Sequence, residues 1–348
     1  MGRRAGALRP AILPKRPRAG HVNGPSPAPR ETCHVTDTAE KAPADAVAAR
    51  AISASGPLVG FACGAGAALI WGVQAVVSRQ SAIDGLTAAD VTVLRFLTAS
   101  VTLLPLALLR LKPFPVGRLG WRRALTLTLF AGAPFSLVLV GGSTFAPALH
   151  TAVIGPGLIP VMSVALAYAV LGERPPAMRL VGLAMIVSGI GLFFWHAASA
   201  APAGDGVWRG DLLFVLAAVM WAMFGTFARK WQADAFDVTI TLSMLSVLVM
   251  PLLVLVVPLR MGSAALGAIV LQALYQGLLA GVVSVFFYAK ANAILGSARA
   301  ALFLPLVPIV TLTAGAVLLG EYPSWPEIAG MAIVMAGMTV ALRADRPA

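Results

Sequence analysis

Any chemistry in this chain would depend on a few polar side chains placed within long apolar runs. Arg95 stands in "VTVLRFLTAS" and Gln74 in "LIWGVQAVVS". An arginine at the centre of a bilayer costs about 2.5 to 3.5 kcal/mol on insertion scales, so intramembrane charges are rare and commonly functional. We expect Arg95 to attract a solute or to form a gate, and Gln74 to line the site or to join helices. Arg95 lies roughly 8 Å into its run, so snorkelling to the interface is the alternative.

A polar stripe is predicted in the run near 267–289. Ser284, Tyr288 and Asn292 are four residues apart, a spacing that places side chains on one face of a helix. Gln276 precedes them and Lys290 stands among them. Inside a helix bundle such a stripe indicates a wetted wall, although Lys290 also fits a simple excess of positive charge on the cytoplasmic side.

Aromatic and proline residues complete the candidate set. An indole can stack on a solute or pack in the interior, and Tyr168 is polar within an apolar run. Proline removes a backbone donor, and the freed groups must then be satisfied by protein, water or solute; a structural kink is the alternative. The predicted substrate cavity or gate comprises Trp71, Gln74, Arg95, Pro156, Pro160, Tyr168, Trp221, Gln276, Ser284, Tyr288, Lys290, Asn292, Pro305 and Pro308.

Composition identifies the elements that must position these residues. Of 348 residues, 59% are hydrophobic and 11% charged, with a mean hydropathy of +0.86, which no soluble domain shows. The runs lack the alternation of barrel strands, so the chain is predicted to be an all-α membrane protein. Ten transmembrane helices are expected, near 57–78, 88–109, 124–143, 151–171, 178–197, 211–228, 237–258, 267–289, 300–320 and 326–342.

The net charge of +12 is explained by orientation in a membrane better than by nucleic-acid binding. The basic residues gather in a Pro-, Ala- and Arg-rich segment, predicted to be a disordered leader over 1–54, and in short loops. Placing the N-terminus in the cytoplasm leaves only Arg79, Arg209 and Arg260 on the outer side. We therefore predict a multi-pass protein of the cell inner membrane with both termini cytoplasmic.

The second half of the chain repeats the first. A shift of 148 residues pairs Pro160 with Pro308, Gly182 with Gly330, Gly189 with Gly337 and "LGE" at 171–173 with "LGE" at 319–321; a shift of 150 pairs Trp71 with Trp221 and Arg79 with Arg229. Matched prolines predict matched helix breaks in the fourth and ninth spans. The predicted organisation is two five-helix repeats, 55–200 and 205–345.

Five is odd, so the second repeat must enter the membrane from the opposite side and the repeats are inverted. The loop charges agree with this inference. Arg174 and Arg179 follow the first "LGE", whereas Tyr322 and Glu327 stand at the corresponding places after the second. Inverted repeats are typical of alternating-access transporters, with the substrate site at their interface.

The remaining ionisable residues offer no catalytic set. His150 is expected at the interface, and Glu173 and Glu321 at helix C-termini, where the macrodipole disfavours anions unless a partner is present. No Asp or Glu is expected deep in a span. Four scattered histidines and two cysteines supply neither a nucleophile with its base nor a metal motif, and a GxxxxGK[ST] motif is absent. We expect no enzyme, cofactor, metal or ATP-driven pump; coupling through His150 or the terminal glutamates stays open.

The chain resembles an EamA-type member of the drug/metabolite transporter superfamily. Over about 55–345 the resemblance rests, in order, on "LIWGVQAVVSR", "VLRF", "LGERPPAMRLVGLAMIVSGIGLFF" and "YAKANAILGSARAALFLPLVPIVTLTAGAVLLGE". It implies ten helices, a central cavity between the repeats, and movement, commonly export, of small organic solutes such as amino acids, metabolites or drug-like compounds.

The expected function is therefore that of a secondary transporter working by alternating access. A non-transporting receptor or assembly factor is the alternative, because fold does not determine function. The expected partners are a small-molecule substrate and the lipid bilayer, without nucleic acid; a homodimer stays open.

Overall fold

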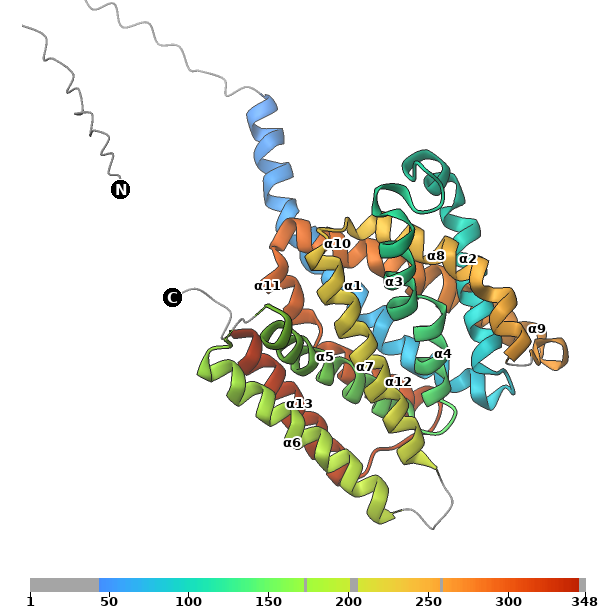
Figure 1. Cartoon of the computed structure of the whole chain (residues 1–348). Helices are drawn as coiled ribbons and strands as arrows, with labels where there is room; N and C mark the ends of the chain where they lie inside the picture. The colour runs from blue at the N-terminus through green and yellow to red at the C-terminus, as the bar shows by residue number, and fades with distance from the viewer. Residues whose placement is uncertain (1–43, 172–173, 201–205, 257–258, 344–348) are drawn as a thin grey trace, which may run out of the picture. The chain divides into compact units, whose positions relative to one another are not determined.

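The computed structural model describes residues 44–171, 174–200, 206–256 and 259–343, within which every regular element is helical (Figure 1). The predicted leader falls largely outside these residues. The α-helices are α1 (Ala44–Ile83), α2 (Ala88–Arg110), α3 (Gly120–Ala131), α4 (Ala133–Gly142), α5 (Ala148–Leu171), α6 (Ala177–Ala200), α7 (Val207–Lys230), α8 (Ala235–Val256), α9 (Leu266–Gln272), α10 (Ser284–Leu295), α11 (Ser297–Ala300), α12 (Leu306–Leu318) and α13 (Trp325–Arg343). Short 3-10 turns are η1 (Gly117–Leu119), η2 (Met261–Ser263) and η4 (Ala301–Phe303), and η3 (Ala273–Val283) is a π-helix.

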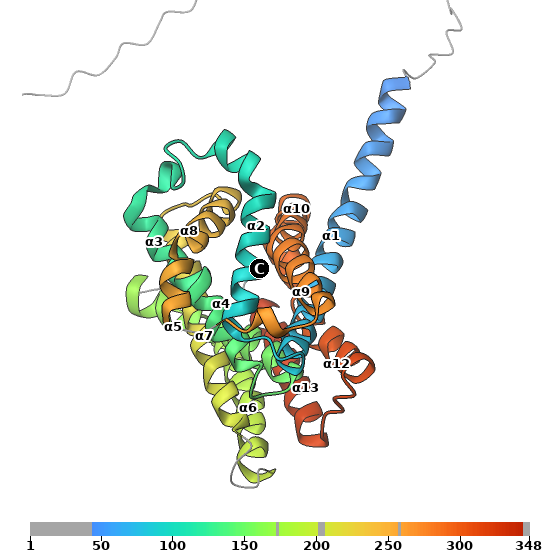
Figure 2. The same ribbon diagram turned by 90° about the vertical axis from the view of Figure 1, so that its right-hand side faces the viewer.

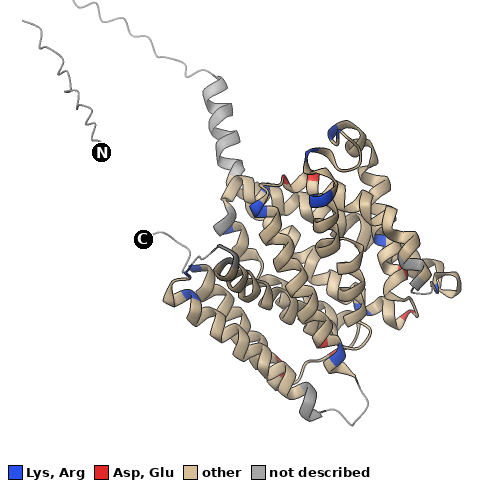
Figure 3. Ribbon diagram, in the orientation of Figure 1, with Lys and Arg blue, Asp and Glu red and all other residues tan. Residues whose placement is uncertain are grey.

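Ten segments of the described residues are long and apolar enough to cross a membrane, which confirms the predicted all-α class with ten spans. The third span joins η1, α3 and α4, and the eighth joins α9, η3 and α10. The third span begins at Gly117 rather than near residue 124. The arginines in its first turns lower the local hydropathy, so the sequence pattern did not indicate a helix there. Figure 3 shows that most Lys, Arg, Asp and Glu residues lie near helix ends.

The start of α2 is fixed by side chains that bind free backbone N–H groups. At the start of α2 the Thr87 hydroxyl accepts from the Asp90 N–H, and the Asp90 carboxylate accepts from the Thr87 N–H at 2.8 Å. Asp90 also accepts from the backbone of Arg260 and Met261. Its buried carboxylate therefore joins α2 to the η2 turn of the other repeat.

The helices α6 and α13 pack against each other along their length (Figure 1). A Cβ atom on Gly182 would lie 2.7 Å from the Gly337 carbonyl oxygen, and one on Gly189 would lie 2.7 Å from that of Gly330. These close approaches require glycine. The positions rise along one helix as they fall along the other, so the helices run antiparallel.

The same glycines reveal the symmetry of the fold. The shift of 148 residues equates Gly182 with Gly330 and Gly189 with Gly337, so the two close approaches are equivalent to each other. Corresponding helices that run antiparallel are related by an axis perpendicular to them, which lies in the membrane plane for spanning helices. The predicted inversion of the repeats, α1–α6 and α7–α13, is confirmed.

Elements of the two repeats interleave elsewhere as well. Figure 2 shows α2 between α8 and the α9–α10 segment, and both neighbours contact it. The largest apolar cluster combines α5 and α6 with α7 and α13, through buried residues that include Ile154, Ile186, Phe214 and Val334. Repeat association is therefore built into the core.

The prediction of matched helix breaks is wrong for the fourth span. The helix α5 continues through both Pro156 and Pro160, because each proline removes a single backbone hydrogen bond and the packed core holds the remaining ones. The ninth span begins irregularly: Gly296 has a φ of +82°, α11 and η4 follow, and α12 starts after Pro305.

Candidate functional site

The first contact between predicted site residues joins α1 to α10. The rings of Trp71 and Tyr288 have centroids 5.1 Å apart and planes inclined by 55°. The residue equivalent to Trp71, Trp221 on α7, makes the corresponding contact with Phe135 on α4, also at 5.1 Å. Each repeat thus places a first-helix indole against an aromatic ring in the third span of the other repeat.

Polar side chains continue this contact along α1. Gln74 donates to Gln276 at 3.2 Å, and Gln276 donates to the Ser78 hydroxyl at 2.8 Å. Two more bonds join this segment to α1. Tyr275 on η3 donates to the Ile70 carbonyl, and Gln272 on α9 donates to the Val77 carbonyl. Interhelical amide and hydroxyl bonds of this kind stabilise contacts between membrane helices, and a π-helix such as η3 commonly occurs at functional sites.

Arg95 is half-buried on α2, with a side chain that lacks a counter-ion among the described residues. Its Nη1 atom is buried without a hydrogen-bond partner there, and its guanidinium carbon lies 5.7 Å from the ring centroid of Phe96. Its backbone carbonyl lies opposite Gly277, the neighbour of Gln276. A buried N–H of a cation without a partner is costly.

The predicted stripe on α10 does not form one continuous polar wall. Ser284 is buried and donates to its own helix at Ala280, and the Asn292 amide donates to the Tyr288 carbonyl. Lys290 is exposed. Tyr288 is therefore the member of the stripe that contacts a predicted site residue on another helix, Trp71.

The other predicted residues lie apart from this contact. Tyr168 is 59% exposed, and Trp221 is exposed on one side beside Phe135. The prolines at 156, 160 and 305 are half-buried in or before their helices, and Pro308 is buried in the first turn of α12. The structure brings together Trp71 with Tyr288 and Gln74 with Gln276.

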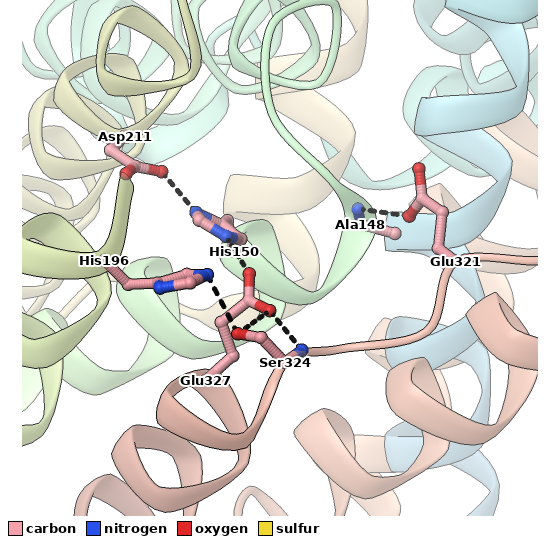
Figure 4. Close-up of polar contacts among 7 residues, drawn as sticks. All are labelled: Ala148, His150, His196, Asp211, Glu321, Ser324 and Glu327. Carbon is pink, nitrogen blue, oxygen red and sulfur yellow. Dashed lines mark hydrogen bonds and ion pairs between the residues drawn. The ribbon is translucent and has the colours of Figure 1, made fainter. Parts of the chain in front are cut away.

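A buried acid cluster lies where none was expected (Figure 4). His150 on α5 contacts Asp211 on α7 through Nδ1 at 2.7 Å and Glu327 on α13 through Nε2 at 2.9 Å. The side chains of His150 and Asp211 are only 2% and 0% exposed. His150 lies in the first turn of α5 and Asp211 one turn after the start of α7, so both are near helix ends, yet both are buried among the helices.

The positions of the acids in this cluster follow from local structure. Glu327 lies in the first turn of α13, where the macrodipole favours anions, whereas Asp211 lies one turn after the start of α7. Glu327 also accepts from the N–H and hydroxyl of Ser324 at 2.6 and 2.7 Å. The "SWPE" capping motif at 324–327 was the one sequence signal that could have pointed to this cluster.

A second polar contact closes the same end of the bundle. Arg79, at the end of α1, pairs with Glu321 at 2.9 Å and donates to the Ser143 carbonyl at 3.0 Å. Glu321 accepts from the Ala148 N–H at 2.9 Å (Figure 4). The partner predicted for Glu321 is confirmed, whereas Glu173 lies outside the described residues. We call this end of the bundle the Arg79 end.

A small cavity of about 160 Å³ lies beside these contacts, lined in part by Thr311, Glu321, Tyr322 and Glu327. Its two carboxylates are the ones bound to Arg79 and to His150. The structure shows no group of three or more His, Cys, Asp or Glu side chains arranged to hold a metal ion within the described ranges.

Comparison with known proteins agrees with this architecture. The model of the EamA-like transporter family matches residues 58–195 and 208–343. An uncharacterized protein of Pseudomonas aeruginosa is 28% identical over 271 residues, which cover 77% of this chain and 87% of that protein. A protein crystal structure is similar with a TM-score of 0.56 at 17% identity, over 84% of this chain and 99% of that one, a likeness that shows the fold alone.

Proposed function

We propose, from the premise that this chain belongs to the EamA-like transporter family, that it exports a small organic solute across the cytoplasmic membrane by alternating access. The family and the ten apolar helices make it a multi-pass membrane protein. The solute class, the outward direction and the mechanism are the content of the proposal.

The observation that carries the proposal is the polar contact between repeats at α1 and η3–α10. Gln74 is partly exposed and makes one hydrogen bond, to Gln276, although an amide can make several, so Gln74 has capacity to bind a solute. Gln276 is fully buried and also bonds to Ser78, so it holds Gln74 in place. Trp71 and Tyr288 add aromatic surface next to them. Inverted-repeat transporters place the substrate at this interface.

Arg95 supports an anionic or zwitterionic solute. Its buried Nη1 atom has no hydrogen-bond partner within the described chain, and its backbone faces the neighbour of Gln276. A carboxylate or similar group of the solute would pair with the guanidinium and offset the cost of burying it. Amino acids and organic acids fit this requirement.

The contacts at the Arg79 end support alternating access. The Arg79–Glu321 pair ties α1 to the segment before α13, and the His150 contacts tie α5 to α7 and α13, so breaking these contacts would open that end. We place this end outside the cell, in agreement with the excess of basic residues at the other end.

The experiment that tests the proposal is untargeted mass spectrometry of the medium of cells expressing the chain. The comparison is a Gln74→Ala, Arg95→Ala double variant. A Thr102→Ala, Ser188→Ala variant is the matched control, since both hydroxyls are exposed and bond only to their own helices. A compound enriched by the unaltered chain and by the control, but not by the double variant, supports export. If the media of all cells contain the same compounds in the same amounts, although each protein is present in the membrane, export is contradicted.

A further inference from the structure

The His150 cluster cannot be satisfied without one extra proton. Each imidazole nitrogen lies within hydrogen-bond distance of a carboxylate oxygen, Asp211 Oδ1 on one side and Glu327 Oε1 on the other. A neutral imidazole has one N–H and one acceptor nitrogen, so with both acids ionised one contact would join two acceptors. The arrangement in Figure 4 therefore holds either an imidazolium or one protonated acid.

This extra proton links the two repeats. His150 belongs to α5 of the first repeat, whereas Asp211 and Glu327 belong to α7 and α13 of the second. Loss of the proton leaves two acceptors facing each other within a largely buried site, which is costly. Deprotonation would therefore weaken one of the contacts that hold the repeats together at the Arg79 end.

The cluster has a route to water on one side. Glu327, whose side chain is 13% exposed, lines the cavity of about 160 Å³, while Asp211 at the far side is fully buried. The second carboxylate oxygen of Asp211, Oδ2, is buried and has no hydrogen-bond partner among the described residues. A proton can pass from cavity water to Glu327, then to His150, whose Nδ1–H donates to Asp211; the reverse steps return it to water.

Other titratable groups around the cluster are few. From α6, His196 reaches it through the Ser324 hydroxyl at 3.0 Å, and Phe193 presents a ring edge to His150. From the segment before α13, Glu321 binds the Ala148 N–H and Arg79. The sequences of α4 and α12 contain no titratable residue. The effect of pH on this end therefore involves His150, its two acids, His196 and the Arg79–Glu321 pair.

The cluster is also one-sided. The repeat shifts equate Asp211 with Phe61 and Glu327 with Arg179, so the same chemistry does not recur at the opposite end of the inverted pair. A single proton site at one end makes the two ends of the symmetric fold chemically different.

We propose that His150, Asp211 and Glu327 form a proton-binding site whose loading controls opening of the Arg79 end, and that it couples solute movement to protons. The coupling rests on the proposed transport function, whereas the binding of protons does not.

The proton is the probe in the first test, which needs no solute. Full-length protein with Cys33→Ser, Cys63→Ser and Tyr322→Cys is labelled with bimane at position 322, which is 81% exposed as Tyr322, and its fluorescence is followed from about pH 5 to about pH 9. We expect a pH response that is lost in His150→Gln and in Asp211→Asn. The matched control, His196→Gln, should keep a response, because His196 reaches the cluster only through the Ser324 hydroxyl.

Two results would overturn the proton site: a pH-independent signal from the unaltered cluster, or an unchanged response in His150→Gln and Asp211→Asn. Asp211→Asn preserves the shape of the side chain, so it decides the matter if His150→Gln does not elute as a monodisperse protein.

The second test addresses coupling, by repeating the medium assay with and without a protonophore. Coupling predicts that the protonophore reduces export by the unaltered chain. If export is unchanged by the protonophore, the proposed coupling is contradicted, but the proposed transport function is not. If no compound is exported, the proposed transport function is contradicted. The bimane titration still tests the proton site independently.

Discussion

The backbone of Gly182 on α6 lies against the backbone of Gly337 on α13, so closely that a Cβ atom on Gly182 would be 2.7 Å from the Gly337 carbonyl oxygen and 2.6 Å from the Ala341 nitrogen. Both neighbours are backbone atoms of a packed helix. A side chain here cannot be accommodated by rotating a neighbouring side chain.

We therefore expect Gly182→Leu to separate α6 from α13 and to lower the free energy of unfolding by about 1 to 3 kcal/mol or more. The measurement is the melting temperature of the purified protein in detergent. The matched control is Gly191→Leu on the same helix, where a Cβ would meet no atom within 4 Å. Equal losses in both variants would contradict the close contact.

Removal of the Arg79–Glu321 pair should weaken the Arg79 end measurably. Its side chains are 24% and 23% exposed, less than those of the Arg110–Asp237 pair at 46% and 26%. A double-mutant cycle of Arg79→Ala and Glu321→Ala should give a coupling of about 0.5 to 3 kcal/mol, and the same cycle on Arg110 and Asp237 about 0.2 to 1 kcal/mol, as for exposed pairs. The reverse order would show that the Arg79 pair does not close this end.

Gln276→Leu should destabilise the contact between α1 and η3. It removes both hydrogen bonds of Gln276 and leaves Gln74 and Ser78 without these partners, at a cost of about 0.6 to 2 kcal/mol for each bond. Ser284→Ala is the control, because its hydroxyl is also buried but bonds only within its own helix. The measurement is the melting temperature of each purified variant. A larger decrease in Ser284→Ala than in Gln276→Leu would argue against the interhelical bonds.

The proposed sidedness can be tested by chemical labelling of intact cells. In a background of Cys33→Ser and Cys63→Ser, a membrane-impermeant maleimide should react with Tyr322→Cys at the Arg79 end. Lys230→Cys, exposed at the opposite end, should react only after permeabilisation. If only Lys230→Cys were labelled in intact cells, the orientation would be the reverse of the proposed one.

Much of the fold follows from the sequence. The apolar runs and the odd number of spans in each repeat are sufficient for ten helices and an inverted pair, because lipid leaves the backbone few alternatives. Local choices were less predictable. The π-helix η3 differs from an α-helix in which carbonyl accepts each backbone hydrogen bond, and the sequence pattern does not show this. The continuity of α5 through Pro156 and Pro160 depends on the packing around that helix.

Candidate site residues can be chosen from the sequence, but the contacts between them cannot. Gln74 and Trp71 were identifiable as unusual in their runs, whereas their partners Gln276 and Tyr288 are fixed by how α1 meets η3 and α10. The His150 cluster was missed because its acids lie 61 and 177 positions away in sequence, and each looks like an ordinary helix-start residue.

The glycine contact between α6 and α13 has a consequence for ancestry. It is self-complementary: Gly182 meets Gly337 as Gly330 meets Gly189, and these residues are equivalent in the two halves. A single five-helix protein that inserted into the membrane in both directions would already possess this contact, as a dual-topology dimer. Gene fusion would then have joined a pair that could assemble beforehand.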